Sequence, residues 1–159
     1  MVDTYTDIQN SSADTDVSPN IYPEFERLAV ILGDWEFNFM SRLLLESLPG
    51  TIPAWSYLST YADDTPFLGT YHDTDLPYIY YNTNNVSTSI RASWISFVNS
   101  LDPNNYAPTT PTGYLTHWST WQEKKQSLEF GSQSTTLMDD NARSASYEYI
   151  RTRLATLRL

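Results

Sequence analysis

His72 is the residue of this sequence with the clearest potential for acid–base chemistry. It lies in the stretch TPFLGTYHDTDLPYIYY, residues 65–81, after Gly69 and directly before Asp73 and Asp75. A histidine at the tip of a loop can act as a general base, although a lone loop histidine is more often structural or simply exposed. Catalysis would also require a nucleophile and an orienting acid within hydrogen-bond reach in space. We interpret Asp73 and Asp75 as helix-capping residues rather than as that acid.

Other chemistries find little support in the sequence. The chain has five glycines and no two are four residues apart, so it contains no G-x-S-x-G nucleophile elbow and no phosphate-binding loop. It has no cysteine, and His117 has no second histidine at helical spacing, so we predict no metal site. The acidic pairs Asp63-Asp64 and Asp139-Asp140 are predicted to be solvated turn residues. Trp118 and Trp121 are predicted to pack in the core.

Composition excludes several classes of protein. The chain is 40% hydrophobic and 14% aromatic, which indicates a folded chain rather than a disordered one. Its net charge of −10 disfavours a nucleic-acid partner. No apolar run is long enough for a transmembrane helix. Residues 1–20 are polar and acidic, and we predict a loop or flexible tail without a signal peptide, so a chain translated from Met1 would stay cytoplasmic.

Two N-glycosylation sequons occur, at Asn10 and Asn85. Such a short motif arises often by chance, so both are only candidate sites and weak hints of secretion.

The elements that would position His72 follow from periodicity. Residues 53–61 alternate as a strand with a mostly aromatic face, and residues 73–81 are predicted to form a short helix with Asp73 as its N-cap. Another helix is predicted to begin at Pro23 and to end or kink at Gly33-Asp34. Three more are predicted over residues 35–48, 90–102 and 140–159. Residues 82–89 are predicted to be a loop, and residues 126–132 a second short strand. Two strands alone make a poor sheet, so their neighbours should lie elsewhere.

Several short motifs follow one another in a fixed order. They are Leu32-Gly33-Asp34, Trp55/Tyr57, Pro66 with Gly69-Thr70-Tyr71-His72 and Asp75, Trp94/Phe97, Leu101-Asp102-Pro103-Asn104, and Asp140/Arg143. In this order they resemble the C-terminal part of the type-B carboxylesterase/lipase family, which is cholinesterase-like, and most closely its fungal lipase and esterase branch. Trp118-Ser119 departs from the family's usual Trp-Pro. The family's serine elbow, oxyanion-hole glycines and triad acid lie upstream of the part that is similar to this chain.

The resemblance implies an α/β fold, namely a helix-rich C-terminal fragment of an α/β-hydrolase with an incomplete sheet. Residues 21–159 would be the C-terminal portion of one carboxylesterase type-B domain. His72 matches the family's triad histidine, which takes the serine proton and returns it to the leaving alcohol. The resemblance further implies a secreted, glycosylated parent enzyme that needs no cofactor. Its substrate would be an uncharged carboxylic ester or an acylglycerol, because the family's gorge is apolar.

The sequence is consistent with three hypotheses for the function. The first is a part of a serine carboxylesterase or lipase that is inactive alone, because the nucleophile, oxyanion hole and triad acid are missing. The second is a non-catalytic, cholinesterase-like binding or scaffold module. The third is a small free-standing domain unrelated to esterases. In the first case we expect unpaired strand edges to make the isolated chain unstable, oligomeric or prone to aggregation.

Overall fold

The chain divides into two compact units. The computed structural model describes residues 25–66, 69–107, 110 and 115–157. One unit comprises the residues up to Ile52 together with those from Asp140 onward, and the other comprises Pro53–Asp139. The predicted tail, residues 1–20, lies outside the described residues.

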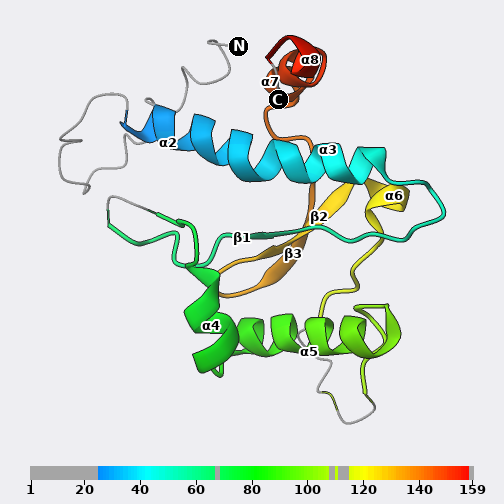
Figure 1. The fold of residues 1–159 in the computed structure, drawn as a ribbon. Coiled ribbons are helices and arrows are strands. Elements are labelled where there is room, and N and C mark those ends of the chain that lie inside the picture. Colours follow the sequence, from blue (N-terminus) through cyan, green and yellow to red (C-terminus); the bar gives the residue numbers. More distant parts are fainter. Residues whose placement is uncertain (1–24, 67–68, 108–109, 111–114, 158–159) are drawn as a thin grey trace. The chain divides into compact units, whose positions relative to one another are not determined.

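The first unit is built on one continuous helix (blue to cyan in Figure 1). It consists of α2 (Phe25–Gly33), a π-helical segment (Asp34–Phe39) and α3 (Met40–Ser47). The helix therefore does not end at Gly33-Asp34, which was one of the two outcomes predicted there. Gly33 keeps right-handed helical angles, φ −61° and ψ −42°, instead of the left-handed ones that end a helix, and the chain continues in wider π turns.

Two short helices, α7 (Ser144–Arg151) and α8 (Leu154–Leu157), replace the single helix predicted over 140–159. Phe39, Tyr147 and Ile150 form the core of this unit, with the Phe39 and Tyr147 rings edge to face at 5.6 Å between centroids. The apolar side chains Phe25, Leu28 and Leu32 recur at helical spacing along α2, and all three are exposed. Helical periodicity identifies an apolar face but not what covers it.

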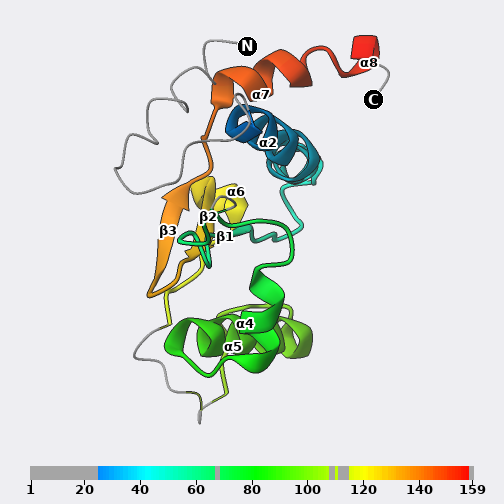
Figure 2. The ribbon, with the colours of Figure 1, turned by 90° about the vertical axis from the view of Figure 1, so that its left-hand side faces the viewer.

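The second unit contains a three-stranded sheet in the order β1-β2-β3 (Figures 1 and 2). Strand β1 (Tyr57–Ser59) runs parallel to β2 (Gln126–Phe130), and β2 pairs antiparallel with β3 (Thr135–Asp139). The two predicted strands are thus each other's neighbours. Only three residues of the range 53–61 form regular strand, and β3 was not predicted.

Three helices complete the second unit, α4 (Asp75–Tyr81), α5 (Asn85–Ser100) and α6 (Trp121–Lys124). Helices α4 and α5 lie side by side in both views. The predicted loop 82–89 is wrong from Asn85 on, because the Asn84 side chain accepts a hydrogen bond from the Ser87 backbone N–H at 2.8 Å and caps α5. Asp73 is also not the N-cap of α4, since Thr74 occupies that position without a side-chain cap bond.

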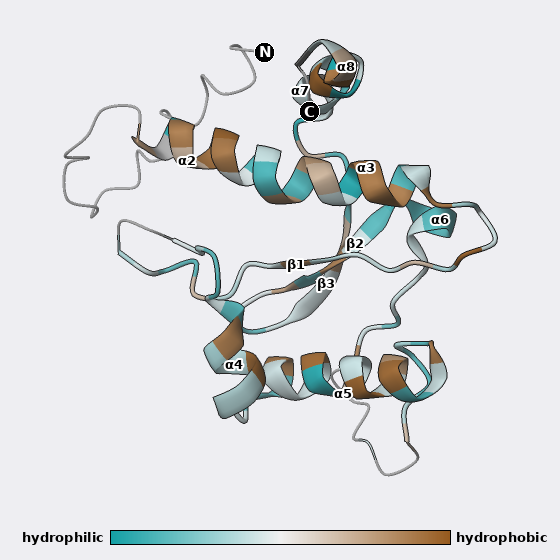
Figure 3. Ribbon diagram, in the orientation of Figure 1, coloured by the Kyte–Doolittle hydropathy of each residue, from teal (hydrophilic) through white to brown (hydrophobic). Residues whose placement is uncertain are grey.

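The core of the second unit joins the sheet to α4 and α5. Its buried members are Tyr61, Ile79, Val86, Ile90, Trp118, Leu128 and Phe130. Trp121 is buried as well, so the predicted burial of both tryptophans is confirmed. Figure 3 shows hydrophobic bands along α5, yet this helix buries serines and leaves Ile95 and Val98 exposed.

Candidate active site

The loop between β1 and α4 carries His72, as predicted. It leaves the strand through two residues with positive φ, Ala62 at 61° and Gly69 at 56°. Glycine suits the second of these positions because a side chain there would be strained whatever the space around it. The Gly69 N–H donates to the Thr65 carbonyl at 2.9 Å, which closes the turn ahead of the histidine.

Two threonines anchor the backbone on either side of His72. Thr70 Oγ1 donates to the Tyr61 carbonyl at 3.0 Å, so the start of the segment is tied to the end of the β1 region. The buried Thr74 donates through both its N–H and its Oγ1 to the Tyr71 carbonyl, at 3.1 and 2.8 Å. His72 is therefore presented on a short, fixed turn between two bonded residues.

The His72 imidazole itself faces solvent. Its Nε2 lies 3.3 Å from Asp73 Oδ1, and the two side chains are 71% and 61% exposed. A pair so exposed contributes little and orients weakly. A triad acid, by contrast, is buried and fixes the imidazole. Asp73 is therefore more exposed than a residue that fixes a triad imidazole would be.

Asp75 has a different environment from Asp73. It is the first residue of α4, and its negative charge influences the hydroxyl of Tyr57 in β1. Burial, with a smaller contribution from the negative charge of Asp75, raises the pKa of the Tyr57 hydroxyl. The Tyr57 ring packs against Trp94 and Phe130, with centroids 6.2 and 5.7 Å away. Asp75 therefore belongs to the packed base of the His72 loop rather than to its tip.

The remaining predicted residues are not brought to His72. His117, Asp63 and Asp64 are exposed. Asn10 lies outside the described residues, whereas Asn85 is exposed at the start of α5. The hydroxyl-bearing residue of the second sequon, Ser87, is 0% exposed, so that sequon is only half accessible in the folded chain.

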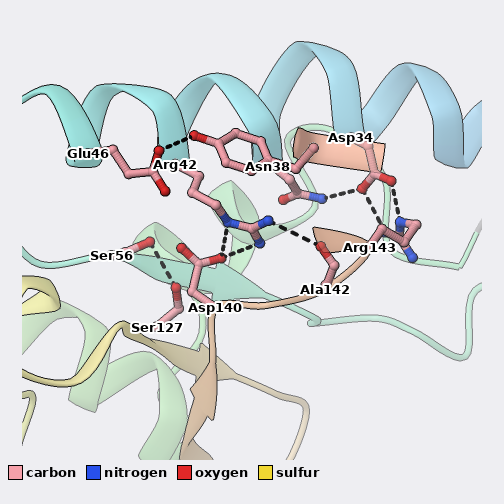
Figure 4. Close-up of polar contacts among 10 residues, drawn as sticks. Asp34, Asn38, Arg42, Glu46, Ser56, Ser127, Asp140, Ala142 and Arg143 are labelled. Carbon is pink, nitrogen blue, oxygen red and sulfur yellow. Dashed lines mark hydrogen bonds and ion pairs between the residues drawn. The ribbon is translucent and has the colours of Figure 1, made fainter. Parts of the chain in front are cut away.

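The family markers Asp34, Asp140 and Arg143 form a polar cluster with Arg42 in the first unit, and Asp34 and Arg42 are buried (Figure 4). Arg143 makes a bidentate contact with Asp34, through Nε and through Nη2 at 2.6 Å. Arg42 binds Asp140 Oδ1 through Nε at 3.0 Å and Nη2 at 2.6 Å. Asp140 is thus an ion-pair partner and not the solvated turn residue that we predicted.

A second family marker, Leu101-Asp102-Pro103-Asn104, is also structural. The Asn104 side chain donates to the Trp118 carbonyl at 2.9 Å and accepts from the Trp118 N–H at 2.7 Å. Leu101 ends α5 in a left-handed conformation, with φ 60°. Sequence analysis recognised these markers but could not show that they bind the fold together.

A groove runs along α5. It is lined by residues such as Thr88, Arg91, Ile95 and Asn99, and does not include His72. Among the described residues, no group of three His, Asp or Glu side chains could hold a metal ion. Within the same residues, no helix is long and apolar enough to cross a membrane.

The chain is similar in sequence to several fungal lipases. It is 39% identical over 136 residues to Secreted lipase 1 of Botryotinia fuckeliana, which covers 82% of this chain and 23% of that protein. It is 35% identical over 136 residues to the secreted triacylglycerol lipase LIP1 of Gibberella zeae, covering 82% of this chain and 22% of the relative. Lipase 4 of Diutina rugosa is 30% identical over 148 residues, or 91% of this chain and 26% of the relative. No family profile matches the chain.

The fold is also found in a solved structure. Aspergillus niger EstA, an α/β-hydrolase, superposes with a TM-score of 0.66 and 17% identity over 100% of this chain and 34% of its own. The helix-rich α/β fold with a small sheet is therefore that of part of an α/β-hydrolase. The chain spans about a quarter of the length of the lipases that it matches.

Proposed function

We propose that this chain, a member of the fungal secreted lipase family, supplies the triad histidine of a serine carboxylic-ester hydrolase. The observation that carries the proposal is the position of His72. It follows a parallel strand, on a turn fixed by Thr70 and Thr74, with its imidazole projecting from the fold. In α/β-hydrolases the histidine comes last in the chain order of the triad, after the serine and the acid.

The chemistry assigned to His72 is general base and then general acid catalysis. Its neutral imidazole would accept the proton of a serine hydroxyl as that oxygen attacks the ester carbonyl. The resulting imidazolium would then protonate the leaving alcohol. A buried carboxylate would have to hold the other ring nitrogen, and Asp73 is too exposed for this role.

The serine, the oxyanion hole and the orienting acid would come from polypeptide equivalent to the part of the lipases that this chain does not span. The sequence holds no G-x-S-x-G elbow. Removal of the nucleophile from such a unit costs nearly all of the rate. We therefore expect the 159 residues alone not to hydrolyse esters in a His72-dependent manner.

The substrate class proposed is an uncharged carboxylic ester or an acylglycerol, and the complete enzyme would act outside the cell. This rests on relatives that are described as secreted lipases, one of them a triacylglycerol lipase. The chemistry of the complete enzyme would call for no cofactor, since proton transfer and acyl transfer proceed through side chains alone.

A non-catalytic binding module is the second candidate, favoured by the exposed apolar residues Ile95 and Val98 of α5 and Leu101 directly after it. A chimera separates the two. We would replace the homologous segment of the B. fuckeliana lipase with this chain and measure p-nitrophenyl ester and triacylglycerol hydrolysis. Hydrolysis by the chimera supports the catalytic role, and a well-folded chimera without activity overturns it.

A smaller chimera covers the case in which the whole segment does not fold in its new context. Only residues 65–81 of this chain would be placed in the same lipase. If this loop presents a competent histidine, activity is retained. Loss of activity in a folded loop chimera would favour the binding module.

A further inference from the structure

The groove along α5 lies within the second unit and has no part in the chemistry proposed for His72. Its volume is about 600 Å³. This volume falls in the usual range of sites for small molecules. Arg91, Ile95 and Asn99 line the groove at intervals of four residues, so they follow one face of the helix. From the first to the last of them the helix rises by about 12 Å.

Arg91 is the only charged residue of α5, whose sequence is NVSTSIRASWISFVNS. Its Nη1 donates to the carbonyls of Ile79 and Asn82, both at 2.8 Å, at the C-terminal end of α4. Carbonyls at the end of a helix have no partner within the helix, so these bonds satisfy them and at the same time hold the guanidinium. The position of the positive charge is therefore set by the fold itself.

The other edge of the Arg91 guanidinium is open. Within the described residues, its Nε has no hydrogen-bond partner, and its Nη2 has only Thr88 Oγ1 at 3.4 Å, which is long for such a bond. Arg42, Arg143 and Arg151 each direct the same Nε–Nη2 edge at a carboxylate. Two parallel donors of this kind match a carboxylate. Arg91 thus presents the edge without the anion.

Nearby acidic side chains are engaged elsewhere. The first acid after α5, Asp102, accepts from the N–H and the Nδ2 of Asn104 at 2.8 and 3.1 Å. Asp75 is the first residue of α4, whereas Arg91 bonds to the last turn of that helix. In a chain with a net charge of −10, Arg91 is a cation that no carboxylate of the described residues pairs with.

The groove beyond Arg91 is partly apolar. Ala92 and Ile95 line it, and the Ile95 side chain is 60% exposed. Two hydroxyls of the lining, those of Ser96 and Ser100, donate to the Asp102 carbonyl at 2.7 and 3.2 Å, so their protons are already in use. The groove therefore combines one fixed positive charge with an accessible apolar surface beside it.

We propose that this groove binds a fatty acid, with the carboxylate on the open edge of Arg91 and the acyl chain over Ile95 toward Asn99. Charge complementarity selects an anion, and the apolar surface selects one with a hydrocarbon chain. The choice of a fatty acid rests on the proposed function, because hydrolysis of an acylglycerol releases one. The groove would then hold a product at a place separate from His72, which does not line it.

The test uses dodecanoate, below its micelle concentration, with the full 159-residue chain. Calorimetry measures the affinity and ¹H–¹⁵N NMR locates the ligand. We expect saturable shifts of the Arg91 Nε–H signal and of the backbone amides from Arg91 to Asn99. Acetate lacks the chain and dodecanol lacks the charge, so each should bind at least about tenfold more weakly than dodecanoate.

Two arginine variants test the charge. Arg91→Gln should lower the affinity for dodecanoate about tenfold, the usual effect of losing a hydrogen bond to a charged group. Arg153→Gln is the matched control. It removes the same charge from another arginine that has no carboxylate partner among the described residues and stacks on Tyr149 outside the groove. Its affinity for dodecanoate should be unchanged.

Two variants of exposed apolar residues test the chain-binding surface. Ile95→Asn should weaken binding of dodecanoate several-fold and leave binding of acetate unchanged. Val98→Asn makes the same kind of change at a neighbouring exposed residue that does not line the groove, and should have no effect. Thermal unfolding checks that all variants fold. If Arg91→Gln does not fold because α4 loses its two bonds, the comparison of Ile95→Asn with Val98→Asn decides.

Three results would overturn the inference. One is the absence of saturable shifts along the groove. Another is an equal loss of affinity in Arg91→Gln and Arg153→Gln, which would indicate only a general attraction between charges. The third is acetate binding as tightly as dodecanoate, which would leave a simple anion site. Ester hydrolysis by the chimera is scored separately. Hydrolysis without dodecanoate binding in the groove rejects this inference alone, whereas dodecanoate binding without hydrolysis rejects only the proposed function.

Discussion

Two groups of polar residues have opposite surroundings in this protein. In the first unit Asp34 pairs with Arg143 and Arg42 pairs with Asp140, and Asp34 and Arg42 are 2% and 5% exposed. His72, in the second unit, projects from its loop and contacts the exposed Asp73. The ion pairs of the first unit are made within this chain, whereas the His72 imidazole faces solvent.

The difference separates structural from chemical roles. When both partners of a buried, bidentate ion pair belong to the same chain, the pair has a structural role, and that role accounts for the two residues in the sequence. The His72 imidazole lies on a tightly bonded turn and is largely exposed, and under the proposed function it would work with a serine and an acid from outside this chain. Substitutions on either side of this contrast should therefore have very different effects.

In the active chimera, His72→Asn should lower kcat/KM on the order of 10⁴- to 10⁶-fold, with the loss mainly in kcat. A triad histidine acts on the transition state, so substrate binding should change little. His117→Asn is the matched control, because it removes the other, exposed histidine. Comparable losses in both variants would show that His72 has no special role.

Arg42→Ala should destabilise the chain by about 3–5 kcal/mol, because it leaves the Asp140 carboxylate without its buried partner. The same change removes the stacking of the guanidinium on Tyr147, 5.0 Å from the ring centroid. Urea unfolding measures the loss. Arg151→Ala, which breaks the exposed pair with Glu148, should leave the unfolding curve almost unchanged.

Asn84→Ala should lower the free energy of unfolding by about 1 kcal/mol, as is usual for the loss of an N-cap, because α5 loses the bond from the Ser87 N–H. The same side chain donates to the Tyr61 hydroxyl, so the loss should not fall below that of a simple cap. Asn85→Ala, one residue on and exposed, serves as the control. If thermal unfolding shows equal effects for the two variants, the capping role is wrong.

Asp73→Asn should change the activity of the chimera by less than about fivefold, because an exposed pair is worth under about 1 kcal/mol. Asparagine tolerates the left-handed backbone of this position, where φ is 72°, so the turn should persist. A loss approaching that of His72→Asn, measured as kcat/KM, would instead identify Asp73 as the orienting acid.

Local signals predicted the loop that carries His72 better than the elements around it. Gly69 and the aromatic alternation of residues 53–61 identify a strand followed by a turn. The helix break failed because Gly33 can adopt helical as well as left-handed angles, and the sequence does not say which. Strand β3 was missed because Thr135–Asp139 has no clear alternation and gains its place by pairing with β2.

The polar cluster was beyond sequence reasoning for another reason. Arg42 and Asp140 are 98 residues apart, and Asp34 and Arg143 are 109 apart. Nothing local links a carboxylate to one arginine rather than another at such distances. The motif order therefore indicated the family, and only the structure assigns these four residues to stability.

The most direct test of the central contrast is an ester-hydrolysis assay on the purified chain alone, with p-nitrophenyl butyrate and with His72→Asn in parallel. A histidine that is positioned but lacks its nucleophile predicts the same background rate for both proteins. A rate well above background that disappears in His72→Asn would contradict the account, because the chain would then hold a complete catalytic centre of its own.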